Sequence, residues 1–294
     1  MESLEVPELP EVETVRRGLE PAMAGARLTA IDQRRPGLRF PFPERFAERL
    51  IGRRIEGLRR RAKYLIADLD GPELLVMHLG MSGSFRIERA KGPDVPVLGA
   101  KPKNPSHDHV VLELSSGARV IYNDPRRFGF MQLIPRNGFC AHPLFKNIGI
   151  EPLCEAFDGA ALARLFAGRT APLKPVLLDQ SLIAGLGNIY VCEALHRAGL
   201  SPRRPAASLV CKNGRLGERA TSLARAIREV LEEAVAAGGS SLRDHRQADG
   251  ALGYFQHCFR VYGRENEFCM RCGGKVRRIT QSGRATFYCG GCQR

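Results

Sequence analysis

Two pairs of cysteines near the end of this 294-residue chain restrict its fold more than any other feature of the sequence. Cys269 and Cys272 form one Cys-x2-Cys pair, and Cys289 and Cys292 form a second pair after an interval of sixteen residues. Each pair can place two thiolates on a tight turn, and two such turns complete the tetrahedral site that Zn²⁺ prefers. Four thiolates leave no open coordination position, so we predict one structural zinc ion.

The residues between the two pairs have the pattern of a β-hairpin. Residues 275–280 and 285–288 are strand-like, and residues 281–283 supply a turn. A segment this short has little core of its own, so we expect the metal to fold it. The cationic side chains of the hairpin are expected to grip phosphates: Lys275, Arg277, Arg278 and Arg284.

The charge of the chain indicates a polyanionic partner. Lys and Arg number 45 against 31 Asp and Glu, which gives a net charge of +14 and favours nucleic acid. No apolar run approaches the roughly 20 residues that span a bilayer, and residues 1–6 are too short and too acidic for a signal peptide. We therefore predict a cytoplasmic, nucleoid-associated protein with no membrane partner. In that compartment, disulfides explain the clustered cysteines less well than zinc does.

Strand-like segments fill the first half of the chain, and helical patterns fill the second. Five segments are typical of antiparallel strands in a sandwich or barrel: residues 64–69, 74–79, 109–114, 119–122 and 130–134. After about residue 156, apolar residues recur at helical spacing. The predicted helices are residues 160–166, 175–182, 188–198 and 218–237. Residues 90–106 are predicted to form an exposed loop, to which we assign no role.

A helix is also predicted near the N-terminus, beside an oddly placed proline. Pro10, followed by acidic Glu11, suits a helix N-terminus, and we expect Glu11 to serve that end. Pro7 stands just before, and a proline nitrogen is a nucleophile only as a free secondary amine. Residues 1–6 would make it a tertiary amide. We therefore hypothesise that translation begins at Val6, read as methionine from a GUG-type codon, and that trimming leaves Pro7 as the terminus.

Several motifs, taken together and in this order, resemble the formamidopyrimidine-DNA glycosylase family, whose members remove 8-oxoguanine and ring-opened purines. The motifs are Pro7–Arg17, Arg61–Leu65, His78–Gly83, Asp124–Gly129, Leu178–Gln180, Gly185–Tyr190, Tyr262–Arg264 and Arg284–Cys289. The resemblance covers essentially all of residues 7–294. It implies an α+β fold with an N-terminal β-sandwich and flanking helices, a helix–two-turn–helix domain and a C-terminal zinc-finger β-hairpin. The implied boundaries are 7–137 for the catalytic sandwich, 138–154 for a hinge, 155–257 for the helical domain and 258–294 for the zinc finger.

The resemblance also implies a bifunctional DNA glycosylase and AP lyase of base excision repair, acting as a monomer on damaged double-stranded DNA. Pro7 would attack C1′ of the lesion and form a Schiff base, and Glu8 would shuttle protons. Lys63 matches a lysine linked to β-elimination, and Arg284 matches an arginine linked to δ-elimination. A guanidinium essentially never deprotonates, so we expect Arg284 to act chiefly as a phosphate clamp.

The implied DNA contacts follow from the need to extrude the damaged nucleotide from the duplex. Met81, Arg126 and Phe128 would fill the gap that is left, since apolar wedges are commonly inserted between base steps. The plane of Arg126 would also face the orphaned cytosine. Residues 238–244 resemble a loop over the extruded base. Phosphate contacts are expected from four residues: His107, Arg169, Lys174 and Asn188.

Three alternatives stay open from the sequence. An endonuclease VIII-type glycosylase shares the scaffold but prefers oxidised pyrimidines, and it typically has glycine where this chain has Leu9. A non-catalytic zinc-containing DNA-binding protein would result if the leader blocks Pro7. A basic zinc-ribbon module of ribosome or transcription machinery would explain the charge and the cysteines, but not Pro7, Glu8 and Lys63 together. Two departures from the family pattern, Phe268 and Gly290–Gly291, do not threaten metal binding.

Overall fold

The computed structural model describes residues 6–88, 104–210, 217–240 and 254–294. Within these ranges the chain forms two compact units. The sandwich unit holds the described residues up to 146 together with those of 237–256, and the helical unit holds those of 147–236 and 257–294. Most of the loop expected at 90–106, and residues 241–244 of the loop expected over the extruded base, lie outside the described residues.

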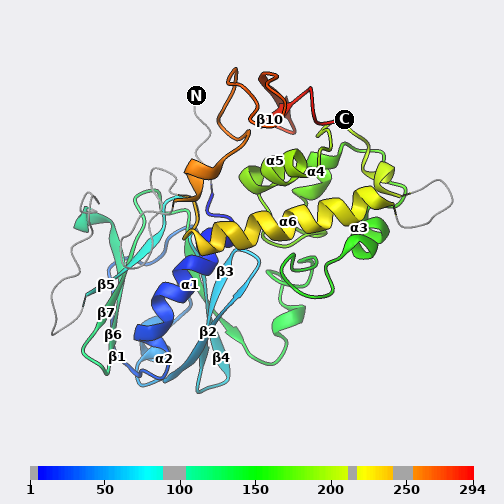
Figure 1. Ribbon diagram of the computed structural model, residues 1–294. Coiled ribbons are helices and arrows are strands. Elements are labelled where there is room, and N and C mark those ends of the chain that lie inside the picture. The colour runs from blue at the N-terminus through cyan, green and yellow to red at the C-terminus, as the bar shows by residue number, and fades with distance from the viewer. Residues whose placement is uncertain (1–5, 89–103, 211–216, 241–253) are drawn as a thin grey trace. The chain divides into compact units, whose positions relative to one another are not determined.

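Two four-stranded antiparallel sheets form the sandwich unit (Figure 1). The first, in the order β2-β3-β4-β8, consists of β2 (Ile55–Arg61), β3 (Tyr64–Leu69), β4 (Glu73–His78) and β8 (Phe130–Pro135). The second, in the order β1-β6-β7-β5, consists of β1 (Leu28–Gln33), β6 (Asp108–Leu114), β7 (Arg119–Asn123) and β5 (Ser84–Glu88). The predicted sandwich is confirmed, and the five predicted strands are each placed to within one residue at either end.

Helix α1 (Leu9–Met23) contributes one face to the core of the sandwich unit. Val12, Val15 and Leu19 recur at helical spacing and are buried in the same cluster as residues from both sheets. Burial of each large aliphatic side chain contributes about 1.5–3 kcal/mol. The core therefore fixes α1, and with it the residues that lead into the helix. Shorter helices of this unit are α2 (Phe46–Leu50), η1 (Pro105–His107) and η2 (Phe139–Ala141).

The helical unit contains α3 (Gly159–Phe166), α4 (Leu173–Leu177), α5 (Asn188–Arg197), α6 (Glu218–Ala236) and the short η3 (Ala206–Leu209). The predicted helix at 175–182 is wrong, because α4 ends at Leu177. Gln180 explains the break: its side chain accepts a hydrogen bond from Gly185 N (2.8 Å) and donates one to Leu186 O (2.8 Å). These bonds fold the chain into the turn that precedes α5. Among the described residues, no helix combines the length and the apolar character needed to cross a bilayer.

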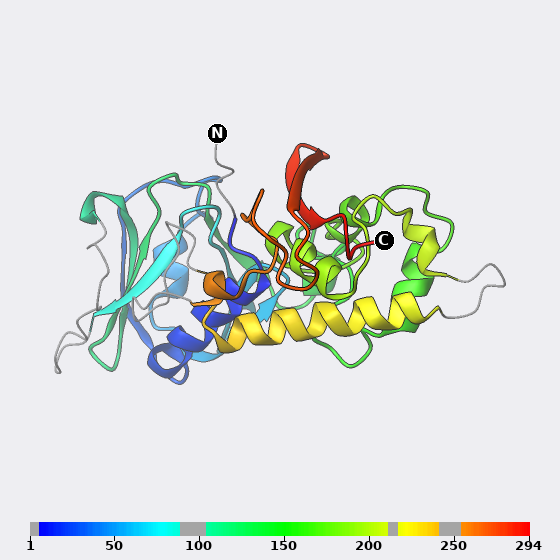
Figure 2. The same cartoon turned by 45° about the horizontal axis from the view of Figure 1, so that its top comes forward.

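The C-terminal hairpin of the helical unit is formed by β9 (Val276–Gln281) and β10 (Arg284–Cys289). The two strands pair in antiparallel register, and β10 packs beside α5 (Figure 2). Both strands lie within one residue of their predicted bounds, so the hairpin is confirmed. A further short helix, η4 (Phe255–Cys258), precedes this segment.

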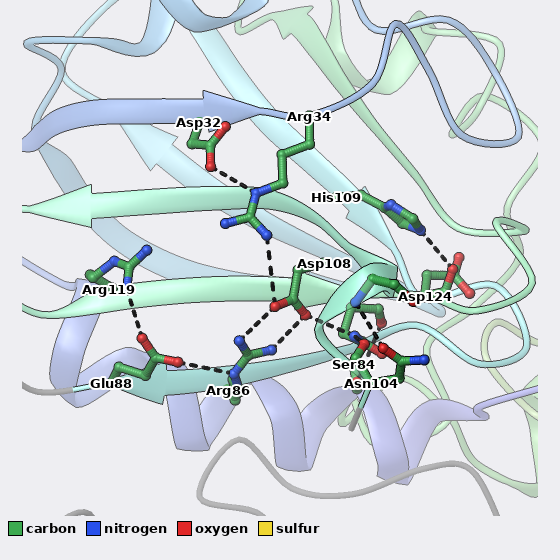
Figure 3. Close-up of polar contacts among 12 residues, drawn as sticks. Asp32, Arg34, Ser84, Arg86, Glu88, Asn104, Asp108, His109, Arg119 and Asp124 are labelled. Atoms are coloured by element: carbon green, nitrogen blue, oxygen red, sulfur yellow. Dashed lines mark hydrogen bonds and ion pairs between the residues drawn. The ribbon is translucent and has the colours of Figure 1, made fainter. Parts of the chain in front are cut away.

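A buried carboxylate organises one face of the β1-β6-β7-β5 sheet (Figure 3). Asp108 is only 4% exposed. It accepts two hydrogen bonds from the guanidinium of Arg86, at 2.6 and 2.7 Å, and one from Asn123 Nδ2 at 2.8 Å. Asn123 Nδ2 also donates to Asn104 O at 3.0 Å. This network ties the start of η1 to strands β5 and β7.

Replacing Asp108 by asparagine is expected to destabilise the protein by about 1–3 kcal/mol near neutral pH, because Arg86 loses its anionic partner. Burial raises the pKa of Asp108, but the hydrogen bonds from Arg86 and Asn123 outweigh burial and hold this pKa below 3.8. The stabilisation is therefore present above the unfolded-state pKa of about 3.9 and is lost as pH falls through the folded-state pKa.

Urea unfolding at about pH 7 and about pH 3 measures this effect, and the difference in unfolding free energy between wild type and Asp108→Asn should be smaller in acid. The exposed carboxylate of Asp32 provides a control, and Asp32→Asn should change stability little at either pH. A difference in unfolding free energy that is the same at both pH values would contradict the prediction.

Candidate functional site

The N-terminal end of α1 holds the first two candidate catalytic residues. Pro7 is buried, and Glu8 is 3% exposed. Glu11, which is fully buried, accepts a hydrogen bond from Glu8 N through Oε2 (3.0 Å). Its other oxygen accepts bonds from Ser240 N and Oγ, both at 2.8 Å. Glu11 therefore serves the helix N-terminus, as the sequence predicts, and also clamps the segment around Ser240.

Lys63, the next candidate, lies in the turn between β2 and β3. Burial, and next the positive charges of Lys63 and Arg39, lower the pKa of His78 to about 4. His78 is thus neutral near pH 7, and its Nδ1 accepts a hydrogen bond from Gly80 N (3.0 Å). Its ring also stacks on Phe130, with centroids 5.3 Å apart. A neutral His78 therefore supports the turn that carries Met81.

The three candidate wedge residues lie on two neighbouring turns of the sandwich unit. Met81 is half-buried between β4 and β5, while Arg126 and Phe128 lie between β7 and β8. Phe128 is 44% exposed, and the guanidinium carbon of Arg126 lies 4.9 Å from its ring centroid. Arg127 between them has a positive φ of 59°. An exposed aromatic ring with an arginine against it suits contact with bases.

One buried side chain fastens these two turns together. Asp124, which is fully buried, accepts hydrogen bonds from Ser82 Oγ (2.5 Å) and from Gly129 N (2.9 Å). Ser82 Oγ in turn accepts a bond from Arg126 N (3.1 Å). Met81 is the neighbour of Ser82 in the chain, so the positions of all three candidate wedge residues depend on one carboxylate.

The main chain of Asp124 extends the same network. Its N–H donates to His107 O (3.0 Å), and its carbonyl oxygen bonds Nε2 of the buried His109 (2.9 Å); the latter contact is drawn in Figure 3. The backbone of His107, a candidate phosphate ligand, is thereby held in a fixed position relative to the candidate wedge residues. A Cβ at Gly129 would stand 1.8 Å from Tyr122 Oη, so only glycine fits there.

In the helical unit, two candidate residues converge on one carbonyl group. Lys174 is fully buried, and its Nζ donates to Ala285 O (2.8 Å) and to Thr286 Oγ1 (2.7 Å). Asn188 Nδ2, at the first residue of α5, donates to the same Ala285 O (3.1 Å). The exposed Arg284 is the preceding residue of β10. The side chains of Lys174 and Asn188 therefore position Arg284. The phosphate contacts of Lys174 and Asn188 stay predictions.

Arg169, the remaining candidate, stands apart from this group within the helical unit. It is exposed after α3, and its Nε donates to Leu165 O (2.8 Å). Its guanidinium is therefore oriented by the helix end and is open to solvent, which suits a phosphate contact.

The four clustered cysteines fit the predicted zinc ion. Their sulfur atoms all lie within 4.8 Å of one another, and the pairs Cys269–Cys292 and Cys272–Cys289 are 3.8 and 3.4 Å apart. Tetrahedral coordination at about 2.3 Å per Zn–S bond places the sulfurs about 3.8 Å apart. The four thiols thus form a closed site for one structural zinc ion.

Sequence reasoning missed three buried polar residues that organise these sites: Asp124, Glu193 and His196. The sequence offered a signal for the last two, because α5 is apolar on nearly every side and a buried polar side chain there must find partners. Asp124 gave no such signal, since an acid before Pro125 in a turn is usually solvated.

Models of three families match successive parts of the chain. The formamidopyrimidine-DNA glycosylase N-terminal domain matches residues 6–131, and the H2TH domain of the same enzyme matches residues 148–246. The zinc finger found in FPG and IleRS matches residues 266–294. The three matches follow one another in the order that the sequence motifs predict.

Curated relatives and solved structures agree with these matches. The chain is 68% identical to the formamidopyrimidine-DNA glycosylase of Beijerinckia indica and 67% identical to that of Methylocella silvestris, covering 98% of this chain and 100% of each relative. The MutM (FPG) protein of Thermus thermophilus is 43% identical, with a TM-score of 0.81 and 98% of both chains covered. A mutant of the Lactococcus lactis FPG, solved in complex with a Fapy-dG containing DNA, is 35% identical with a TM-score of 0.83, covering 98% of this chain and 100% of its own.

Replacing Asp124 by asparagine is expected to weaken binding to duplex DNA by about tenfold to a hundredfold, because an amide cannot satisfy Ser82 Oγ and Gly129 N as an anionic acceptor does. Fluorescence anisotropy with a labelled duplex measures the affinity. The matched control is Asp70→Asn, which removes an exposed carboxylate of the same unit. Equal affinities for wild type and Asp124→Asn would show that the two turns hold without this carboxylate.

Proposed function

Because the chain belongs to the formamidopyrimidine-DNA glycosylase family, we propose that Pro7 is the nucleophile with which it releases oxidised purines from DNA. The protein is a DNA glycosylase of base excision repair with AP lyase activity, and damaged double-stranded DNA is its substrate. The observation that carries the role of Pro7 is its position: it is buried directly before Glu8, whose N–H is held by Glu11.

The chemistry requires the nitrogen of Pro7 as a free amine. An α-amino group has a pKa of about 8, so a useful fraction is neutral at physiological pH, whereas a lysine near 10.4 would need a large shift. The nitrogen attacks C1′, the glycosidic bond breaks, and the base leaves with a proton. The sugar ring opens, its O4′ takes a proton, and an iminium links C1′ to Pro7.

The iminium then accounts for the lyase activity. It acidifies C2′, so loss of a C2′ proton expels the 3′ phosphate in β-elimination. A second proton loss expels the 5′ phosphate in δ-elimination, and water releases the sugar remnant from Pro7. We assign proton transfer at the sugar oxygen to Glu8, because it adjoins the nucleophile and is buried beside it.

The remaining cations bind and orient the DNA backbone. The positive charge of Lys63 helps to lower the pKa of His78, so it acts close to the turn that leads to Met81. Arg284 is presented by β10, whose next residue is bonded to Lys174 and Asn188. We propose that Lys63 and Arg284 bind the phosphates that flank the lesion. We also propose that Met81, Arg126 and Phe128 fill the gap that the extruded nucleotide leaves in the base stack.

We further propose oxidised purines, rather than oxidised pyrimidines, as the preferred lesions. Leu9 is fully buried in the first turn of α1, at a position where the pyrimidine-specific branch typically has glycine. A wild-type Lactococcus lactis FPG has been solved with an oxidized pyrimidine containing DNA, so the two lesion classes should be compared directly. Because chromosomal DNA is the substrate, we place the protein in the cytoplasm, associated with the nucleoid.

A chain that begins at Pro7 should form a covalent adduct with lesion DNA under borohydride, because hydride reduces the iminium to a stable amine. A chain that retains residues 1–6 should form none, since its Pro7 nitrogen is an amide. The match of the family's N-terminal domain from residue 6 onward supports this comparison. Intact-mass analysis must first verify both proteins.

Two further measurements complete the test of Pro7. Intact mass of the native protein shows which form the cell contains, and a mature chain that retains the leader would overturn the terminal-proline mechanism. The control is the Pro7-initiated chain acetylated at its nitrogen, which should bind lesion DNA but give no adduct. An equal adduct yield from the chain that retains residues 1–6 would show that another amine is the nucleophile.

Single-turnover excision should be at least about tenfold faster from an 8-oxoguanine:cytosine duplex than from a thymine-glycol duplex, since a pocket that hydrogen-bonds one base edge rejects the other. The rate constants come from quenched reactions with enzyme in excess. Both duplexes should otherwise share one sequence. Faster release of thymine glycol would assign the chain to the pyrimidine-specific branch.

A further inference from the structure

His196 lies against the zinc-binding sulfurs but belongs to a helix of the helical unit. It is the penultimate residue of α5 and is 1% exposed. Its Nε2 lies 3.3 Å from Cys269 Sγ and 3.7 Å from Cys292 Sγ. These two cysteines come from different Cys-x2-Cys pairs. One imidazole nitrogen therefore contacts both halves of the metal site.

The chemistry of the site fixes which way these hydrogen bonds run. Zinc-bound cysteines are thiolates, which have no proton and can only accept. The hydrogen must then be on Nε2 of His196. The other ring nitrogen, Nδ1, is buried with no hydrogen-bond partner among the described residues, so no second contact orients the ring. His196 is not a fifth ligand, because four sulfurs complete the tetrahedron.

The surroundings of His196 are cationic. A cavity of about 450 Å³ is lined by His196, Met270 and three arginines: Arg197, Arg260 and Arg271. Four thiolates outweigh the charge of one Zn²⁺, so the metal centre is anionic. Positive groups around His196 and an N–H directed at two sulfurs both stabilise that negative charge.

His196 is the last of three anchors that α5 makes to the C-terminal segment. Asn188, at the first residue of the helix, bonds Ala285 O. Glu193 accepts hydrogen bonds from the backbone N–H groups of Arg260, Val261 and Tyr262 at 2.9, 3.0 and 2.8 Å. His196 supplies the third anchor at the metal site itself. Figure 2 shows α5 beside the hairpin that these contacts hold.

We propose that His196 is a positioning residue of the zinc centre, donating its Nε2–H to the thiolates of Cys269 and Cys292. The hydrogen bonds withdraw charge from these two sulfurs, which makes them poorer nucleophiles toward oxidants and poorer bases toward protons. They also fix the metal site to the end of α5. The zinc finger is thereby joined to the helix whose first residue is Asn188.

The first test compares two substitutions of this histidine. His196→Phe keeps the ring but removes the donor, and His196→Gln keeps an N–H donor near the position of Nε2. Zinc release into excess chelator, with or without hydrogen peroxide, is followed by a colorimetric zinc indicator. His196→Phe should release zinc about 10–100-fold faster than wild type, and His196→Gln should recover most of the difference.

The second test observes the hydrogen bond without any substitution. In protein loaded with ¹¹³Cd and labelled with ¹⁵N-histidine, a correlation between the metal and the Hε2 proton of His196 should appear, because scalar coupling passes through the N–H···S bond. A ring protonated on Nδ1 instead, with no such correlation, would overturn the proposal. This readout stands even where His196→Phe fails to fold.

A matched control separates this role from general damage. His142→Phe makes the same chemical change in the sandwich unit, where His142 bonds Leu144 N and packs near Phe145. It should leave zinc release at the wild-type rate. Release from His196→Phe at the wild-type rate, or equal acceleration in His196→Phe and His196→Gln, would overturn the proposal, since neither result depends on the N–H donor.

Discussion

Buried carboxylates that accept backbone N–H groups hold the functional segments of this protein in place. Glu11 bonds the backbone of Glu8 and Ser240, Asp124 bonds that of Gly129, and Glu193 bonds three successive residues of the C-terminal segment. A buried carboxylate without such partners costs several kcal/mol. Each of these carboxylates therefore favours the loop conformation that directs the N–H groups toward it. The loops gain a fixed shape in this way without large hydrophobic cores of their own.

Features that depend on local patterning could be predicted from the sequence. Strands such as β3 follow from short apolar runs between turn residues, and the zinc hairpin follows from the cysteine spacing. The end of α4 could not be predicted, because the side chain of Gln180 bonds Gly185 and Leu186 across a turn and overrides the apolar run. The roles of Pro7, Glu8 and Lys63 rested on resemblance, since no local rule assigns a nucleophile.

Lys174 has a structural role that its assignment to a phosphate does not include. The family resemblance assigns Lys174 to a phosphate, and in the structure its side chain is fully buried, with the ammonium donating to Ala285 O and Thr286 Oγ1. Its charge still contributes to the field around β10, because a buried ammonium is screened less than an exposed one. It also orders the strand that presents Arg284, and its own contact with a phosphate stays a prediction.

The strand β10 is short enough for both of its ends to be fixed. Cys289 at one end is a zinc ligand, and at the other end Ala285, next to Arg284, accepts hydrogen bonds from two helices of the helical unit. A six-residue strand held at both ends cannot shift its register by one residue without breaking one set of contacts. Zinc therefore acts on Arg284 through the strand although it lies at the opposite end. The zinc ion in this way helps to set the position of Arg284, whose contact with a phosphate stays a prediction.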